Sequence, residues 1–284
     1  MPAGEICGSI DEVVASLEPL LARDGRAVLK PELGTAGSGV IIVDANSTDT
    51  SGTELRPYIE ARMAQRPALF YSGPYVVEAF VGPSGGTEDL SHGATFVTVF
   101  IHSDGMFETL GAARERRNTH NRIAAVEVGR DSGPANTPEM FDESVRTLCA
   151  AAAAIGYRGS AIFDFLLDSH ADPAVIEMNA RRGTAGFVFT LAQALFGPDW
   201  TNRHSGLIRL PLHVEPSERL NPDRVLDVIE TTNQSLSGDA VIVPVSLTWL
   251  KLPNPGVAIV TFGSDRTAIS EAESGLSEWL AQVS

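Results

Sequence analysis

Lysine and cysteine are both scarce in this sequence of 284 residues, which contains only Lys30, Lys251, Cys7 and Cys149 of these two types. Two thiols are too few for a disulfide framework or for a site of several thiolate ligands. Cys149 lies in an alanine-rich stretch with helical spacing, so we expect it to be buried and unreactive. Because arginine supplies the rest of the 21 basic residues, a lysine inside a glycine motif stands out.

The chain also has little positive charge overall and no long apolar run. It carries 36 acidic residues and a formal net charge of −15, which repels nucleic acid and anionic lipid. No apolar run reaches the roughly 18 residues of a spanning helix, and the first residues do not resemble a signal peptide. We therefore expect a soluble, cytoplasmic protein with reduced thiols that binds neither nucleic acid nor membrane.

Hydrophobic periodicity predicts a chain of mixed helices and strands. A capping box of Ser9 and Glu12 should begin a helix over residues 9–23. Further helices are expected at 53–65, 138–156, 186–197 and 214–235, and at the C-terminus. Strands are expected at 26–30, 39–44, 75–82, 160–168, 174–180, 240–250 and 256–263, with two more in 94–113 around an Asp-Gly turn.

A glycine-rich segment, VLKPELGTAGSGVIIVD, spans residues 28–44. Its glycines lead into a β-branched run that predicts a strand, whereas the dinucleotide-binding and Walker loops lead into a helix. A loop between two strands can still cover a triphosphate, because glycine lets backbone N–H groups approach the phosphate oxygens. Protein kinases use such a cover, but their lysine follows the loop and Lys30 precedes it. The alternative is an ordinary hairpin loop with a surface lysine.

A second group of polar residues lies in a predicted hairpin about 140 residues later. If Leu167 pairs with Ala174, then Asp164 faces Glu177, and Asn179 lies on the same face of the strand. Opposed carboxylates repel each other unless a cation lies between them. Two carboxylates and an amide oxygen suit Mg²⁺ shared with phosphate. The alternative is a pair of exposed carboxylates on an edge hairpin, although the apolar neighbours favour a mostly buried sheet.

Together these elements resemble the ATP-grasp superfamily. The shared features are a lysine before a glycine loop, the segment VVEAFVG, an acidic strand, and the sequence EMNAR on the following strand, and they cover roughly residues 9–210. The resemblance implies two α+β subdomains with antiparallel sheets, at 1–80 and 81–210. Residues 211–284 are then expected to form a small C-terminal α/β extension.

The resemblance also implies roles for individual residues. Lys30 would contact the phosphates of ATP and take part in catalysis, beneath a cover that includes Gly34, Gly37, Ser38 and Gly39. Glu78, Ala79 and Val81 would belong to a hinge that binds adenine, partly through its backbone. Mg²⁺ (or Mn²⁺) would be held by Asp164, Glu177 and Asn179, and Arg181 would steady the transferred phosphate or the acyl-phosphate.

The arginine-rich segment ARERRNTHNR lies between the predicted hinge and the predicted metal hairpin. In ATP-grasp enzymes the corresponding segment often lines the substrate site, so Arg116, Arg117, His120 and Arg122 are candidates for binding an anionic substrate. The alternative is a solvated loop in an arginine-rich protein. ATP-grasp members usually have about a hundred residues before the first helix seen here, which often supply a second phosphate lysine. A homodimer, or a partner chain that supplies that region, is therefore a further expectation.

Most ATP-grasp members are ligases, so the resemblance implies an ATP- and Mg²⁺-dependent enzyme that joins a carboxylate to an amine through an acyl-phosphate. The products would be ADP and phosphate, with a peptide or amide bond. Peptide ligases of the pheganomycin type carry C-terminal extensions of this general sort. Two alternatives are a small-molecule kinase of the same fold and a nucleotide-binding subunit that needs a partner chain for activity.

Overall fold

The computed structural model divides into two compact units, each with its own sheet and its own apolar core. The first unit comprises residues 1–84 and 167–174, and the second comprises residues 85–166 and 175–284. The structure describes residues 2–31, 39–46, 52–65, 73–81, 92–117, 123–129, 138–167, 172–200, 205–213, 221–236, 239–247, 250 and 256–283.

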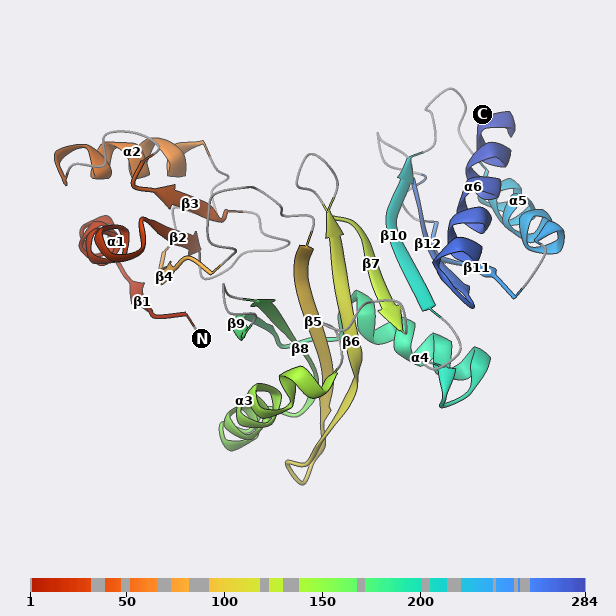
Figure 1. Ribbon diagram of the computed structural model, residues 1–284, viewed down its shortest axis with the longest axis horizontal. Coiled ribbons are helices and arrows are strands. Elements are labelled where there is room, and N and C mark those ends of the chain that lie inside the picture. The colour runs from red at the N-terminus through yellow and green to blue at the C-terminus, as the bar shows by residue number, and fades with distance from the viewer. Residues whose placement is uncertain are drawn as a thin grey trace. The chain divides into compact units, whose positions relative to one another are not determined.

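The first unit is a four-stranded antiparallel sheet, with the order β1-β4-β2-β3, packed on two helices (Figure 1). Alternate residues of the strands, such as Ala27, Leu29 and Val77, are buried against apolar side chains of both helices. The remaining strand residues lie on the face opposite to α1 and α2. The elements are β1 (Gly4–Cys7), α1 (Ile10–Asp24), β2 (Arg26–Pro31), β3 (Ile41–Asp44), α2 (Gly52–Ala64) and β4 (Tyr75–Ala79).

Both ends of α1 show why the sequence forms this helix. The hydroxyl of Ser9 accepts a hydrogen bond from the amide of Glu12, as the predicted capping box requires. The carboxylate of Glu12 returns to the amide of Gly8 rather than to that of Ser9. At the other end, Gly25 has a φ of 72°, a left-handed conformation that favours glycine and stops the helix.

The second unit is built on an eight-stranded sheet with the order β11-β12-β10-β7-β6-β5-β8-β9 (Figure 1). Its pairs from β8 through β5, β6, β7, β10 and β12 to β11 are antiparallel. The strands are β5 (His92–Ile101), β6 (Phe107–Arg117), β7 (Ile123–Gly129), β8 (Gly159–Leu167), β9 (Pro173–Asn179), β10 (Ser205–His213), β11 (Val241–Ser246) and β12 (Gly256–Gly263). The helices are η4 (Pro138–Phe141, 3₁₀), α3 (Asp142–Ala154), α4 (Thr184–Phe196), α5 (Pro222–Ser235) and α6 (Arg266–Val283).

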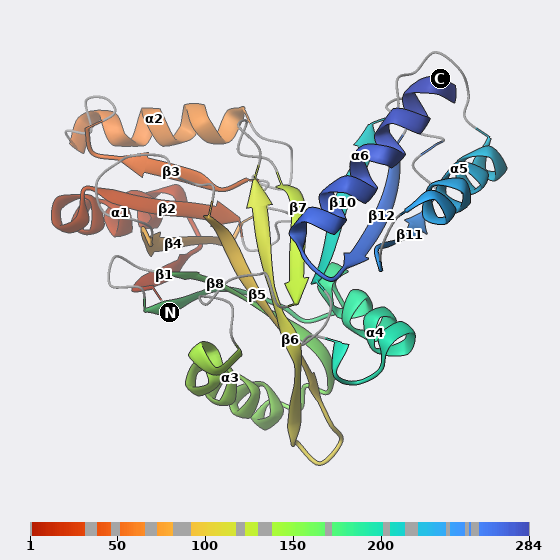
Figure 2. The same ribbon diagram turned by 45° about the vertical axis from the view of Figure 1, so that its right-hand side comes forward.

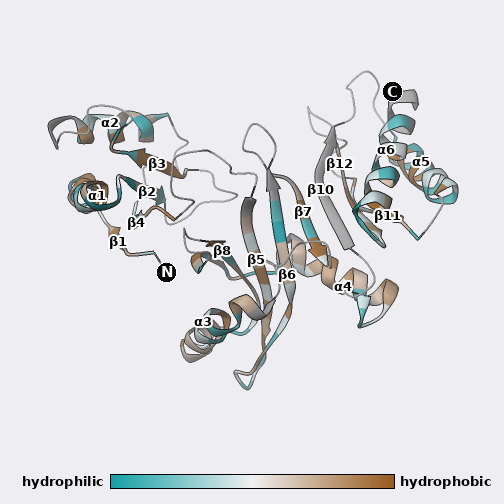
Figure 3. Cartoon of the chain, viewed as in Figure 1, coloured by the Kyte–Doolittle hydropathy of each residue, from teal (hydrophilic) through white to brown (hydrophobic). Residues whose placement is uncertain are grey.

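Helix α4 covers one face of this sheet and is apolar along most of its length (Figure 3). It packs on Ala113, Val128 and Phe262. The strand registers place Asp164 and Phe96 in the same cross-strand row as Ala113 and Val128. Asp164 therefore lies on the same face of the sheet as the residues of β6 and β7 that pack against α4.

The opposite face of the sheet is covered by α3 at one end and by α5 and α6 at the other, where Figure 2 shows α6 lying along β10 and β12. Near α3 the ring of Phe141 lies 4.7 Å from that of Phe165. Val228 of α5 and Leu276 of α6 pack with Ile259 of β12. The predicted boundary near residue 210 therefore lies inside one unit, because β10–β12 continue the same sheet.

Most predicted helices and strands are present, with differences at their ends. The predicted helix over 138–156 begins with a 3₁₀ turn, and the helix predicted from 186 already begins at Thr184. Three strands were not predicted, namely β1, β7 and β10. As expected, Cys149 is buried within α3, and burial raises the pKa of its thiol to about 11. In the described part of the chain, no helix is long and apolar enough to cross a membrane.

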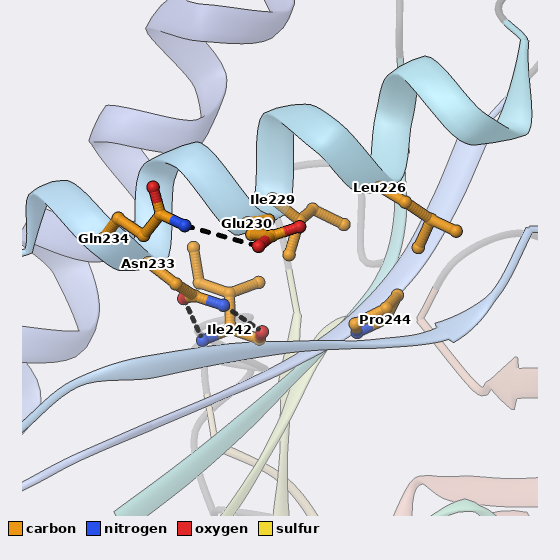
Figure 4. A pocket seen from close by; sticks show the side chains of 7 residues that line it. All are labelled: Leu226, Ile229, Glu230, Asn233, Gln234, Ile242 and Pro244. Atoms are coloured by element: carbon orange, nitrogen blue, oxygen red, sulfur yellow. Dashed lines mark hydrogen bonds between the residues drawn. The ribbon is translucent and has the colours of Figure 1, made fainter.

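The strand β11 forms one edge of the eight-stranded sheet, and a side chain of α5 occupies its outer backbone groups (Figure 4). The amide group of Asn233 donates to the carbonyl of Ile242 over 2.9 Å, and its oxygen accepts from the amide of Ile242 over 2.8 Å. Two residues later Pro244 has no N–H to offer. These features stop a further strand from adding at this edge.

The Asn233→Ala variant should be about 1–2 kcal/mol less stable than the wild type, because the amide and carbonyl of Ile242 lose their partner. Alanine is the better helix former, so a loss cannot come from helix propensity. Urea unfolding measures the difference. The matched control is Gln234→Ala, which removes only a hydrogen bond to the exposed Glu230; equal losses in the two variants would contradict the assigned role.

Candidate functional site

Lys30 and Glu78 form an ion pair on the face of the four-stranded sheet that points away from α1 and α2. Lys30 Nζ lies 2.6 Å from Glu78 Oε2, and about a fifth of each side chain is exposed. The register pairs Val28 with Glu78 and Lys30 with Val76, so the two charged residues are diagonal neighbours on one face. The predicted phosphate lysine and the first residue of the predicted hinge therefore lie together.

The glycine segment connects two neighbouring antiparallel strands, β2 and β3. This agrees with the strand–loop–strand arrangement predicted from the sequence. Gly39 lies two residues before the start of β3. Its φ of 92° is a left-handed conformation that favours glycine. Gly34, Gly37 and Ser38 lie outside the described residues.

The predicted hinge begins within β4 and continues past its end. Glu78 and Ala79 belong to the strand, and Val81 follows it. The amide of Ala79 already donates to the carbonyl of Ala3 over 2.8 Å. The contact of this segment with adenine stays a prediction.

In the second unit, Asp164 is a buried carboxylate on β8, with 9% of its surface exposed. Its pKa is raised to about 8, chiefly by burial and then by the charges of Glu177 and Glu115. Its Oδ1 is buried and accepts no hydrogen bond. A buried carboxylate oxygen without a partner is costly, and a bound cation would remove that cost.

Asn179 and Arg181 form a chain of hydrogen bonds that leads to Asp164. Asn179 Nδ2 donates to Asp164 Oδ2 over 3.4 Å, and Arg181 Nη2 donates to Asn179 Oδ1 over 3.2 Å. Asp164 and Asn179 therefore share one face of adjacent strands, as predicted. The strand ends at Asn179, so Arg181 reaches this amide from the following turn and not from a continued strand.

The residues present suit a hard cation that is also bound by phosphate. Glu177 is exposed on the edge strand β9, while Asp164 is buried, so the hairpin is neither fully buried nor fully exposed. Among the described residues, no three His, Cys, Asp or Glu side chains gather to hold a metal ion. Asp164, Glu177 and Asn179 would leave several positions around Mg²⁺ for phosphate oxygens and water. Their assignment as metal ligands stays a prediction.

Gly183 allows the turn that carries Arg181 to lie against β8. A Cβ atom at this position would lie 2.1 Å from the side chain of Ile162, which is two residues before Asp164 on the same strand. The neighbouring Arg182 turns to α4 instead, where its guanidinium donates to the hydroxyl of Thr190. Only one of the two consecutive arginines therefore takes part in the polar chain to Asp164.

The predicted substrate arginines lie at the end of β6. The backbones of Arg116 and Arg117 pair with Ala125 and Ile123 of β7, so the segment begins as strand rather than as loop. His120 and Arg122 lie outside the described residues. Sequence reasoning missed Glu115, which is 2% exposed and close enough to raise the pKa of Asp164. An acidic residue inside an alternating run was its only signal.

Comparisons with known proteins show what this chain resembles. No protein-family model and no curated protein matches it. A biotin carboxylase from Campylobacter jejuni, solved in a β-γ-ATP complex, matches with a TM-score of 0.64 and 14% identity over 99% of this chain. The biotin carboxylase domain dimer of a Hydrogenobacter thermophilus 2-oxoglutarate carboxylase, solved with MgADP, ADP and bicarbonate, matches with a TM-score of 0.64 and 15% identity over 97% of it. A carboxyaminoimidazole ribonucleotide synthase from Aspergillus clavatus, solved with ATP, matches with a TM-score of 0.56 and 14% identity over 100% of it.

These similarities confirm the predicted fold, an α+β fold of the ATP-grasp type with antiparallel sheets. The chain covers 66% and 61% of the two carboxylase chains and 70% of the synthase chain. It therefore spans about two thirds of the length of these structural neighbours. At identities of 14–15%, the fold is what they share.

The environment of Asp164 predicts how the stability of the metal-free chain depends on pH. Because its pKa is raised in the folded state, the folded chain holds this proton more tightly than the unfolded chain. The stabilisation is complete below the unfolded pKa of 3.8 and is lost as the pH rises through about 8. Asp164→Asn should therefore be more stable than the wild type at pH 7.5, on the order of 1–3 kcal/mol, and no more stable at pH 4.

Urea unfolding in the presence of a chelator, at several pH values, measures this difference. The control is Asp199→Asn, which changes an exposed carboxylate and should follow the wild-type curve at every pH. If the free energies of unfolding of Asp164→Asn and the wild type changed with pH in parallel, the folded chain would not be raising the pKa of the Asp164 carboxyl.

Proposed function

We propose that this chain is an ATP- and Mg²⁺-dependent carboxylate–amine ligase. The buried, unpartnered Oδ1 of Asp164, on a fold shared with ATP- and ADP-bound carboxylases and synthases, is the observation that carries the proposal. Lys30, which precedes a glycine segment between paired strands, supports it from the first unit. The carboxylate of Asp164 could bind Mg²⁺, and the ammonium group of Lys30 could bind phosphate oxygens, which are the two contacts that a metal-bound triphosphate needs.

In the first unit, Lys30 would bind phosphate oxygens of ATP. Glu78 now neutralises its ammonium group, and an arriving triphosphate would compete for the same charge. When phosphate binds Lys30, the carboxylate of Glu78 becomes available as an acceptor for an exocyclic amine of the base. Gly34, Gly37, Ser38 and Gly39 would bring backbone N–H groups over the phosphates.

In the second unit, metal binding would require Asn179 to turn its amide. Its NH₂ group now points at Asp164 and its oxygen accepts from Arg181. An oxygen ligand must instead point at the cation. That turn would release the guanidinium of Arg181, which could then bind the transferred phosphoryl group. Mg²⁺ held by Asp164, Glu177 and Asn179 would neutralise charge on the phosphate oxygens.

The proposed reaction has two steps. A carboxylate oxygen of the acid attacks the γ-phosphorus of ATP, and ADP leaves with the electrons of the broken P–O bond. The amine then attacks the acyl carbon, phosphate leaves, and the amine nitrogen loses a proton. Lys30 and Arg181 would stabilise the charge on the phosphoryl oxygens. Arg116, Arg117 and His120 would bind the acid.

The finer parts of the proposal concern substrates and partners. A peptide-like or amide product, as in ligases of the pheganomycin type, is the product class that the resemblance favours. A homodimer, or a partner chain that completes the acceptor site, fits a chain spanning about two thirds of its structural neighbours. A small-molecule kinase is the alternative on the same site, and it would release no free phosphate during turnover.

Calorimetric titration with ATP, with and without Mg²⁺, tests the proposal directly. We expect binding that requires Mg²⁺ in the wild type and is weakened at least about tenfold in Glu177→Gln, which keeps the shape of the side chain but removes a metal ligand. Lys30→Ala should weaken binding by a similar factor through lost phosphate contacts. The control is Glu108→Gln, a change at an exposed carboxylate of β6. Absence of ATP binding by the wild type would overturn the proposal.

Arg181→Ala should lower the rate of phosphate release by about 100-fold or more and change ATP affinity by less than about threefold, because its charge is needed mainly in the transition state. Arg182→Ala is the matched control, since Arg182 donates to Thr190 and not to Asn179. Steady-state release of ADP and phosphate, measured once acid and amine substrates are found, gives both quantities. Equal losses in rate and affinity would assign Arg181 to ATP binding instead.

A further inference from the structure

Arg26 lies on the face of the four-stranded sheet that points away from α1 and α2, at the end where β4 stops. Its guanidinium carbon is 5.2 Å from the centroid of the Phe80 ring, and its Nε donates to Asp44 Oδ2 over 2.8 Å. The other oxygen of Asp44 accepts from the amide of Asn46. Both hydrogen bonds lower the pKa of the Asp44 carboxyl, so the partner of Arg26 stays charged at neutral pH. Asp44 of β3 therefore holds the guanidinium group of Arg26 in place over the ring of Phe80.

Phe80 is the first residue after β4. The last pair between β2 and β4 joins Ala27 to Ala79. Arg26 and Phe80 would form the next pair, and they are connected through their side chains. A cation over an aromatic face attracts it electrostatically, and arginine does so with a planar group that can also pair with a carboxylate at its edge.

Phe80 lies between Ala79 and Val81, two residues of the hinge that the resemblance to ATP-grasp proteins links to adenine. The amide of Ala79 is engaged by Ala3, and the carboxylate of Glu78 is paired with Lys30. The carbonyl of Ala79 and the amide of Val81 would then be the backbone groups that meet the edge of the base, beside the carboxylate of Glu78 once phosphate has replaced it at Lys30. Their relative direction depends on the backbone dihedrals of Phe80, so a contact that holds Phe80 also positions both groups.

We propose that Arg26 is a positioning residue for nucleotide binding, which fixes the backbone of residues 79–81 by stacking on Phe80. This role rests on the proposed function, because an enzyme that uses ATP must hold its base and the ATP-grasp resemblance places the base at this segment. Arg26 and Lys30 are four residues apart on one strand, about 13 Å. Arg26 should therefore influence the base end of the nucleotide and leave the phosphate end unaffected.

The first test needs no nucleotide. Hydrogen exchange in the ligand-free chain should show the amides of Ala79, which donates to Ala3, and Phe80 exchanging at least about fivefold faster in Arg26→Met than in the wild type. Arg26→Lys should give an intermediate rate, since it keeps the pairing with Asp44 but loses the planar face. The matched control is Arg23→Met, which removes an exposed pair with Asp24 and should change neither amide. Unchanged exchange in Arg26→Met overturns the role.

The second test compares two ligands by calorimetry in the presence of Mg²⁺. ATP affinity should fall about fivefold to tenfold in Arg26→Met, and affinity for inorganic tripolyphosphate, which lacks a base, should stay within about twofold. Phe80→Leu should give a similar loss. Because Arg26 acts through Phe80, the double variant should be no weaker than either single variant.

The outcomes separate this role from the proposed function. If the wild type binds neither ATP nor tripolyphosphate, the proposed function is overturned, and base positioning with it. If the wild type binds ATP but Arg26→Met binds it equally well, only the role of Arg26 is wrong. Equal weakening of ATP and tripolyphosphate, or additive losses in the double variant, also overturns it.

Discussion

The arrangement of charge in the first unit depends on one constraint, that its sheet is covered by helices on a single face. Alternate strand residues such as Leu29 and Val77 are buried against α1 and α2, so their neighbours must lie on the other face. Lys30, Glu78, Arg26 and Asp44 all occupy that face. A one-residue shift of β2 would bury both cations, so the apolar core also fixes which groups are presented to a ligand.

Several of the candidate groups are held by local partners in the ligand-free chain. Lys30 pairs with Glu78, and the amide of Asn179 joins Asp164 to Arg181. These partners reduce the desolvation free energy that charged side chains cost at partly buried positions. A ligand that binds one of these side chains has to replace the contact with its partner. Asp164 is the exception, because one of its oxygens is buried without a hydrogen bond. The least satisfied group of the described site is therefore the one to which the metal is assigned.

Local patterns predicted local structure well. Three features could be predicted because each depends on residues near it in the chain. They are the helix cap at Ser9, the Asp-Gly turn between β5 and β6, and the burial of Cys149. The strands β1 and β10 were missed, since their partners lie far away in sequence. The strand β7 was missed although it pairs with the preceding strand β6, because the polar, arginine-rich segment before it gave no sign of a strand pair. The same limit applies to the site. The polar face of the EMNAR segment could be predicted from period-two spacing, whereas the edge position of β9 and the contact of Arg26 with Phe80 depend on sheet order.

The two halves of the proposed site rest on separate cores. Leu29, on β2 beside Lys30, belongs to the core of the first unit, whereas the core beneath α4 contains residues of the second unit only. A change at Arg26 or Lys30 therefore need not disturb the core beneath α4, although the tip of the hairpin that carries Asp164 is grouped with the first unit. Nucleotide contacts and metal contacts can then be altered one at a time. Loss of binding after a change in either unit can be assigned to the contact removed once the folding of that unit has been measured.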